Sequence, residues 1–247
     1  MPRIDAWLIC GGRWHDFDFA RLELLKLLAE DQDVRVRVSW DFRDVEFLST
    51  ARCVISYTCD LRPSQAEQEA LSDYVRAGGR WFALHGTNSV FEFKPDGVHS
   101  PRALPTLMQT LGSQFIAHPP IAPYRVQVSP GADHPFVHDI APFETADELY
   151  LCEYHGEIRP LLETRFSGEA RGFAESSWPD DTPRLVAYLH PYGAGEVLYY
   201  TLGHCRGRWD MQPMLEEYPR IERGSWELPV HYMLLRRGIA WAKGQLA

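Results

Sequence analysis

The segment Arg80-Trp-Phe-Ala-Leu constrains the fold of this chain more than any other. A continuous run of large apolar residues, without polar alternation, is typical of a strand buried on both faces of a parallel sheet. It follows a predicted helix over Gln65 to Ala77, which begins with a capping box of Ser64 and Glu67 and ends at Gly78-Gly79. A helix that leads directly into a buried strand indicates an α/β fold.

The first sixty residues show the same alternation of strands and helices. An apolar run over Ala6 to Cys10 predicts a buried strand, and leucines spaced three residues apart from Leu22 to Leu28 predict an amphipathic helix. Two further strands are expected over Val34 to Ser39 and Cys53 to Tyr57. This order predicts an open, mostly parallel, doubly wound sheet with helices on both faces.

The second half of the chain has weaker patterns. We expect a helix over Ser100 to Leu111, an irregular segment from Phe115 to Ile121 and a closing helix over Val230 to Ala242. Strands are expected over Tyr124 to Val128, Glu148 to Tyr150, Leu185 to Leu189 and Glu196 to Thr201, with a tight turn at Gly193-Ala-Gly. The sequence contains no repeat and no Ser/Gly linker, so we predict one domain over residues 1–247.

Charge and cysteine content narrow the class of protein. The net charge is -9 and the basic residues are scattered, which argues against nucleic acid as a partner. No apolar stretch reaches the roughly 18 residues of a membrane span, and the N-terminal sequence does not resemble a secretory signal. Five cysteines without C-x-x-C spacing indicate free thiols, so we expect a cytoplasmic protein that does not bind membranes.

Four histidines, His15, His85, His118 and His204, fall in polar loops just after predicted strands. The carboxyl ends of parallel strands lie at one edge of the sheet, where ligands bind in open α/β folds, so we expect His15, His85 and His204 to share that edge. His118 lies in a segment that could reach over the same pocket. A single histidine near an apolar segment is more often structural, but independent structural histidines need not gather at one edge.

His85 has the most informative context. The run Ala83-Leu-His-Gly-Thr after an apolar strand has the layout of a nucleophile elbow, a strained turn that exposes one side chain. Elbows normally present Ser or Cys for attack on a carbonyl. Histidine at this position predicts proton transfer, metal ligation or hydrogen bonding instead, and an inert replacement is the alternative.

Other polar and aromatic residues are candidates for the same site. Asp16 could orient His15 or bind a sugar hydroxyl, or simply cap the next helix. Glu148 could supply acid/base chemistry or a metal ligand, or be a surface carboxylate, and Tyr150 should share its strand face. The candidate substrate-binding residues are Trp14, His15, Asp16, His118, Tyr150, Arg206 and Trp209.

Metal binding is an open alternative at this stage. His15, His85 and His204, with a nearby carboxylate, would suit a divalent ion such as Zn²⁺ or Mn²⁺. The chain has no local metal motif of the H-E-x-x-H kind. The ligands would therefore have to converge from distant loops.

Several short motifs, in order, resemble the ThuA-like trehalose-utilisation family of the class I glutamine amidotransferase-like superfamily. The resemblance covers nearly the full length and rests on their order and spacing. The motifs are Gly11-Gly12 with His15-Asp16, Leu61-Arg-Pro-Ser, Tyr74-Val-Arg-Ala-Gly-Gly, Leu84-His-Gly, Phe115-Ile-Ala-His-Pro, Asp133-His-Pro, Asp147-Glu-Leu-Tyr, Tyr200-Thr-Leu-Gly-His and Gly238-Ile-Ala-Trp-Ala.

The resemblance implies a flavodoxin-like sheet and relates His85 and His204 to a glutaminase site. In the glutaminases of that superfamily a cysteine stands on the elbow and a histidine ends a later strand. Here His85 matches the cysteine position and His204 the histidine, so release of ammonia from glutamine by that route is not expected. The acidic and aromatic segment Glu216 to Trp226 departs from the commonest family pattern, which leaves the substrate open.

The family name implies action on trehalose or its oxidised 3-keto derivatives. We therefore predict a carbohydrate-metabolism enzyme (an isomerase, lyase or hydrolase) with His85, His204 and Glu148 as catalytic residues and a sugar as its partner. The alternative is a sugar-binding module that has lost its chemistry, and a third possibility is a metal-dependent hydrolase. A homo-oligomer is compatible with the content of Trp and Tyr, 8 and 11 residues.

Overall fold

The computed structural model describes residues 3–246, and nine strands of this range form one sheet. Their order is β2-β1-β3-β4-β13-β12-β11-β8-β9. The first five strands run parallel, in the order of a flavodoxin-like sheet. They are β2 (Val34–Ser39), β1 (Ile4–Gly12), β3 (Cys53–Cys59), β4 (Arg80–Leu84) and β13 (Gly195–Tyr200). The predicted open, mostly parallel α/β sheet is confirmed.

The other four strands extend the sheet with antiparallel pairings. They are β12 (Ser177–Tyr192), β11 (Arg159–Glu169), β8 (Ala122–Val128) and β9 (Phe143–Asp147). The sequence did not predict β9, β11 or most of β12. Pro179, Asp180, Asp181 and Pro183 give β12 the composition of a loop, and these residues lie where the strand is exposed.

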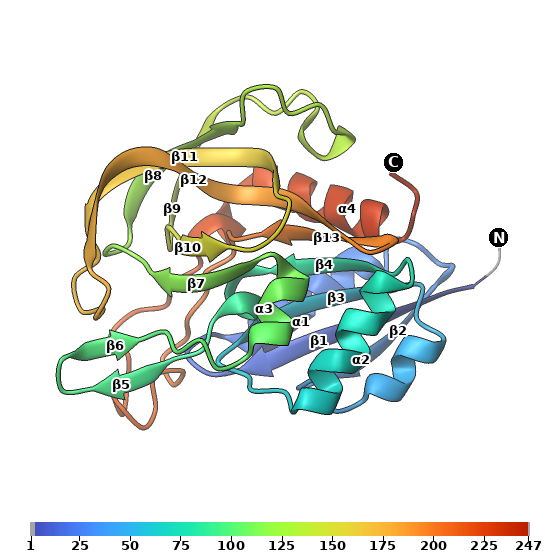
Figure 1. Cartoon of the computed structure of the whole chain (residues 1–247), viewed down its shortest axis with the longest axis horizontal. Helices are drawn as coiled ribbons and strands as arrows, with labels where there is room; N and C mark the ends of the chain where they lie inside the picture. Colours follow the sequence, from blue (N-terminus) through green and yellow to red (C-terminus); the bar gives the residue numbers. More distant parts are fainter. Residues whose placement is uncertain (1–2, 247) are drawn as a thin grey trace.

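Helices cover both faces of the sheet, as predicted (Figure 1). Helices α1 (Phe17–Leu28) and α4 (Pro229–Ala242) pack on one face, and α2 (Gln65–Arg76) and α3 (Pro105–Leu111) pack on the other. Successive side chains of a strand point to opposite faces, so β1 sends Leu8 into one core and Trp7 into the other. Both faces of the sheet are therefore buried, which explains why β3 and β4 consist largely of apolar residues.

The helix predictions were close at α2 and α4 and wrong in part at α1 and α3. The capping box of Ser64 and Glu67 is present at the start of α2. In α1 the predicted apolar face is wrong in part, because Leu22 is 53% exposed while Ala20, Leu24 and Leu27 are buried. The helix expected from Ser100 begins only at Pro105, since the residue before a proline disfavours helical geometry while proline itself fits the first turn.

Two short antiparallel pairs stand beside the main sheet. The pair of β7 (Ser113–Ala117) with β10 (Leu151–Tyr154) was not expected, because the segment from Phe115 had been predicted to be irregular. The second pair is the hairpin of β5 (Glu92–Lys94) and β6 (Gly97–His99), which projects from the end of β4 (Figure 1). The hairpin therefore reaches out at the edge where His85 follows β4.

The predicted strand over Glu148 to Tyr150 is wrong. These three residues connect β9 of the main sheet to β10, which pairs with β7. The chain has to leave one hydrogen-bonded ladder before it enters the next, so Glu148 and Tyr150 belong to neither. No helix among residues 3–246 is long and apolar enough to cross a membrane.

Packing between α4 and β4 leaves no room for a side chain at Gly238. A Cβ atom there would lie 2.2 Å from Cζ of Phe82, a fully buried ring. We expect Gly238→Ala to lower the free energy of unfolding by about 1–3 kcal/mol because it overpacks the core. Alanine stabilises a helix by about 1 kcal/mol relative to glycine, so helix propensity alone would predict an increase in the free energy of unfolding. Urea unfolding followed by tryptophan fluorescence measures the change.

The Phe82→Leu background is the control for this prediction. Leucine lacks the outer ring atoms that Gly238→Ala would meet. The cost of Gly238→Ala should therefore fall by about 1 kcal/mol or more in that background. An equal cost in both backgrounds would show that the contact with Phe82 is not responsible.

Candidate functional site

His85 occupies a strained turn at the carboxyl end of β4. Its φ is +45°, in the left-handed region that non-glycine residues rarely adopt, and it begins the short 3-10 helix η2 (His85–Asn88). The hydroxyl of Tyr199 donates to the carbonyl of His85 at 2.6 Å and accepts from the amide of Asn88 at 2.9 Å. Gly86 is required beside it, because a Cβ atom would lie 2.7 Å from the carbonyl oxygen of Thr58. The turn has the elbow geometry expected from the sequence.

The imidazole of His85 is fixed in orientation. Its ring stacks on Tyr57, with centroids 5.7 Å apart and planes at 15°, and packs against Tyr150 at 5.0 Å. Nδ1 donates to the carbonyl of Thr201 at 2.7 Å, which directs Nε2 toward His15. His85 is completely buried, so this nitrogen faces other protein atoms rather than solvent.

Four buried side chains from separate segments meet at this edge of the sheet. Nε2 of His15 lies 2.9 Å from Nε2 of His85. Glu148 places Oε2 3.5 Å from His85 Nε2 and 3.8 Å from His15 Nε2, and Oε1 3.1 Å from His204 Nδ1. One ligand-type atom from each of the four residues lies within 4.8 Å of all the others. We call these residues the histidine–glutamate cluster.

Asp147 holds the chain segments that carry the cluster. Its buried carboxylate accepts hydrogen bonds from the backbone amides of Gly203 (3.0 Å), His204 (3.1 Å) and Ser225 (2.9 Å). It also accepts from the amide of Glu148 at 2.8 Å. Asp147 therefore ties the turn at Glu148 to the loop after β13. Asp147 was not among the predicted site residues, although it stands next to Glu148 in the motif Asp147-Glu-Leu-Tyr.

Glu222 and Arg206 form the outer side of the cluster. His204 Nε2 donates to Glu222 Oε2 at 2.9 Å, and the Arg206 guanidinium lies 3.2 Å from the same oxygen. Arg206 Nη2 is also 3.7 Å from Glu148 Oε1. Tyr218 donates to the other oxygen of Glu222 at 3.0 Å. Glu222 and Tyr218 were not predicted, and both lie in the acidic, aromatic segment Glu216 to Trp226.

Burial and neighbouring charges shift the pKa values of the cluster residues in different directions. Burial lowers the pKa of His15 to about 3, against the opposing effect of Glu148. Burial also opposes the charged form of His204, but the carboxylates of Glu148 and Glu222 raise its pKa to about 9. Burial works against ionisation of Glu148 as well, yet His204 and His118 hold its pKa well below its usual range. The site therefore favours an ionised Glu148 and a neutral His15.

A cavity of about 550 Å³ is lined in part by Glu148 and His15 of the cluster. His118, Arg206 and Glu222 also line it. Aromatic residues line much of the remainder, namely Trp14, Phe91, Phe93, Phe173 and Tyr218. Phe93 belongs to the β5–β6 hairpin. The volume lies within the usual range of pockets for small molecules.

The structure brings together most of the predicted site residues. Trp14, His15, His118, Glu148 and Arg206 line the cavity, and His85, Tyr150 and His204 lie beneath it or beside it. The expected convergence of His15, His85 and His204 is therefore observed. The roles assigned to these residues stay predictions.

Three predicted substrate-binding residues, Asp16, Tyr150 and Trp209, are not among the residues that line the cavity. The carboxylate of Asp16 accepts from the amide of Phe19 at 3.1 Å as the N-cap of α1, and pairs with Arg223 at 3.0 Å. This is the capping alternative, and it does not orient the His15 ring. Trp209 is 59% exposed and is not among the residues that line the cavity.

The cysteines are free thiols, as predicted, and lie outside the cluster. Cys205 adjoins His204 in sequence, but its Sγ lies 3.2 Å from the hydroxyl of Tyr57. Burial raises the pKa of the Cys59 thiol well above its usual value. The side chain presented by the elbow is thus an imidazole, with no thiolate to attack a carbonyl.

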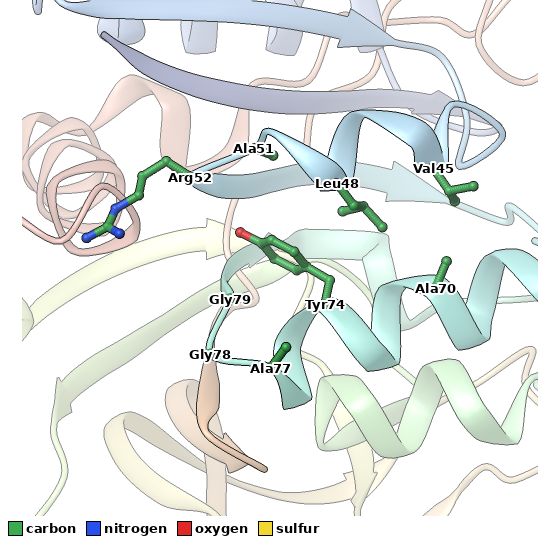
Figure 2. Close-up of a pocket in the computed structure, with 9 residues that line it drawn as sticks. All are labelled: Val45, Leu48, Ala51, Arg52, Ala70, Tyr74, Ala77, Gly78 and Gly79. Atoms are coloured by element: carbon green, nitrogen blue, oxygen red, sulfur yellow. The ribbon is translucent and has the colours of Figure 1, made fainter. Parts of the chain in front are cut away.

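Another hollow, of about 430 Å³, lies at the opposite edge of the sheet between α2 and the 3-10 helix η1 (Val45–Ser49) (Figure 2). It adjoins Arg52 and Gly79, which stand at the amino ends of β3 and β4. Of the nine residues that line it, Arg52 is the one with a charged side chain, and the Tyr74 ring lies near the middle (Figure 2). The titratable groups that could support chemistry gather at the carboxyl edge instead.

Comparison with known proteins gives one family match. The family model described as trehalose utilisation (ThuA) matches residues 10–217. Among curated proteins, none matches the sequence at a significant level.

Several solved structures share the fold. A ThuA-like protein of Bacteroides uniformis ATCC 8492 is 17% identical, with a TM-score of 0.67 over 98% of this chain and 91% of that chain. A ThuA-like protein of Parabacteroides merdae ATCC 43184 is 16% identical, with a TM-score of 0.62 over 99% and 92%. The β-galactosidase of Rahnella sp. R3 is 13% identical, with a TM-score of 0.58, and 99% of this chain matches 32% of that enzyme. At these identities the likeness concerns the fold alone.

The position of Asp147 leads to a stability prediction. We expect Asp147→Asn to lower the free energy of unfolding by about 2 kcal/mol or more, because an amide group faces backbone N–H donors that a carboxylate satisfies. Urea unfolding measures this change. Asp133→Asn is the matched control, since the Asp133 side chain is 97% exposed and should change stability by no more than about 0.5 kcal/mol. Similar small effects for both variants would contradict the anchoring role of Asp147.

Proposed function

Because the chain belongs to the trehalose-utilisation (ThuA) family, we propose that it is a carbohydrate-metabolism enzyme acting on a disaccharide or its 3-keto derivative. The observation that carries the proposal is the cavity of about 550 Å³ that is lined in part by the buried histidine–glutamate cluster. Its combination of aromatic and charged lining residues suits a sugar, whose C–H faces pack on rings while its hydroxyls form hydrogen bonds. The sugar is the expected partner, and free thiols favour a cytoplasmic setting.

His118 and Glu148 are the groups best placed to move protons at the cavity. Nδ1 of His118 donates to the carbonyl of Pro119 at 2.7 Å, so the neutral ring keeps Nε2 as a proton acceptor. That nitrogen lies 3.7 Å from Glu148 Oε1, and both residues line the cavity. His85 and His204 contact the same carboxylate from the protein side and fix its position.

These positions support proton abstraction next to a carbonyl. In a 3-keto sugar, the base takes a proton from the carbon beside the carbonyl, and the electron pair of the C–H bond moves to the carbonyl oxygen. Arg206, which lines the cavity and is always charged, can stabilise the resulting enolate oxygen. Return of the proton to the former carbonyl carbon, while the hydroxyl proton on the deprotonated carbon passes to the enolate oxygen, gives an isomer whose carbonyl has moved by one carbon. Elimination follows instead when the electron pair of the enolate expels an oxygen substituent from the next carbon, and the departing hydroxide or alkoxide takes up the proton that the base removed.

The test is product formation from disaccharides. Untagged protein is incubated with trehalose, other disaccharides and their 3-keto forms, with and without added Zn²⁺ or Mn²⁺, and products are followed by NMR. We expect turnover in proportion to protein concentration, and a fall in kcat of about 10²–10⁴ for Glu148→Gln and His118→Ala because each removes a group at the reacting atoms. His138→Ala changes an exposed histidine and should keep full activity.

Two results would count against this proposal. A sugar that raises the melting temperature but is recovered unchanged would indicate a binding module instead. Turnover that survives unchanged in both Glu148→Gln and His118→Ala would place the chemistry elsewhere in the molecule.

A further inference from the structure

We propose that His15, His85, His204 and Glu148 bind one divalent transition-metal ion, with Zn²⁺ and Mn²⁺ as the first ions to test. Glu222 is assigned as a positioning residue that orients His204. The proposal stands on the geometry of the cluster and does not require the substrate class suggested above. Its failure and the failure of the proposed function can therefore be distinguished.

The first observation concerns two nitrogens that face each other. Nδ1 of His85 donates to the carbonyl of Thr201 at 2.7 Å, and Nδ1 of His15 faces the carbonyl of Arg13 at 3.3 Å. An imidazole that donates from Nδ1 has, when neutral, a lone pair on Nε2. The two Nε2 atoms are 2.9 Å apart in a buried environment. Two lone pairs at this distance repel unless a proton or a cation lies between them.

The second observation is a nitrogen that has no hydrogen-bond partner among residues 3–246. Nε2 of His204 donates to Glu222, which leaves Nδ1 as the other ring nitrogen. Nδ1 is buried and lies 3.1 Å from Glu148 Oε1, but the contact lacks hydrogen-bond geometry. A buried polar atom without a partner is costly, and this one points into the cluster. A metal ion bound by the cluster would satisfy it.

The distances suit a single ion. With bonds of about 2.1 Å, two ligand atoms on one metal lie about 3.0 Å apart at a right angle and about 3.4 Å apart at the tetrahedral angle. His15 Nε2 and His85 Nε2 are 2.9 Å apart, and Glu148 Oε2 is 3.5 Å from His85 Nε2 and 3.8 Å from His15 Nε2. All four ligand atoms lie within 4.8 Å of one another. Small side-chain rotations are enough to place them around one ion.

The donor set points to a class of metal. Imidazole nitrogens suit Zn²⁺, Fe²⁺ and Ni²⁺, and a carboxylate oxygen extends the range to Mn²⁺. Three nitrogens disfavour Ca²⁺ and Mg²⁺, which prefer oxygen ligands. The cluster contains no thiolate or thioether, so it does not select Cu⁺.

The surroundings of the cluster leave one side open to a substrate. Glu148 and His15 line the cavity, whereas His85 is buried behind them. An ion held here would be reached from the cavity, as in catalytic sites that keep an open coordination position. The hydrogen bond of His204 to Glu222 has the form of a carboxylate–histidine pair that orients a metal ligand. Arg206 lies 3.7 Å from Glu148 and is the competing cation.

The test measures metal content and affinity. Untagged protein is stripped with a chelator, equilibrated with Zn²⁺ or Mn²⁺, and analysed by mass spectrometry of the metal and by competition with a chromogenic chelator. We expect one equivalent in the wild type and a metal-dependent rise in melting temperature. Glu148→Gln and His85→Gln should weaken affinity at least 100-fold, and Glu222→Gln 10–100-fold. His138→Ala, at an exposed histidine, should retain one equivalent at unchanged affinity.

A second measurement keeps the test decisive if the cluster variants fail to fold. X-ray absorption at the zinc edge of the loaded wild-type protein should report three imidazole ligands and a carboxylate. The proposal would be overturned by fewer than two imidazole ligands. It would also be overturned by a metal content no higher than that of a protein without such a site. Full retention of metal in folded Glu148→Gln and His85→Gln would also overturn it. Sugar turnover in a protein that binds no metal would leave the proposed function standing and remove the metal site alone.

Discussion

The site depends on two adjacent carboxylates, Asp147 and Glu148, which are both buried and act on different partners. Asp147 accepts hydrogen bonds from the backbone amides of Gly203, His204 and Ser225, and so fixes the loop after β13 against the turn after β9. Glu148 faces the other way and contacts the imidazoles of the cluster. A buried carboxylate is costly unless it is paired, and the histidines and backbone donors provide the pairing. These contacts hold the distant loops together at the edge of the sheet.

Much of the site's scaffold was predictable because each of its strands carries a strong local signal. The apolar runs of β1 and β4 identify buried parallel strands, and such strands deliver whatever follows them to one edge of the sheet. The sequence therefore predicts that His15, His85 and His204 lie together. The elbow at His85 was also predictable, since a tight turn with glycine follows a buried strand.

The antiparallel half and the outer residues of the site could not be predicted by the same reasoning. β12 contains two prolines and two aspartates within its exposed part, which is the composition of a loop. Glu148 lies in the connection from β9 to β10. The course of this connection depends on the pairing of β10 with β7, two strands that lie far apart in the sequence. Glu222 reaches His204 through a backbone bridge between Arg206 and Glu222. These contacts are set by tertiary packing, which leaves no periodic signal in the sequence.

The most direct test of the metal site is a crystal structure of the untagged protein with Zn²⁺, measured on both sides of the zinc absorption edge. We expect one anomalous peak within bonding distance of His15 Nε2, His85 Nε2, His204 Nδ1 and Glu148, on the side that faces the cavity. A map without a peak at the cluster, from crystals whose solution contains excess zinc, would contradict it. In that case the four side chains would be a proton-sharing network, and the chemistry of the cavity would rest on acid and base groups alone.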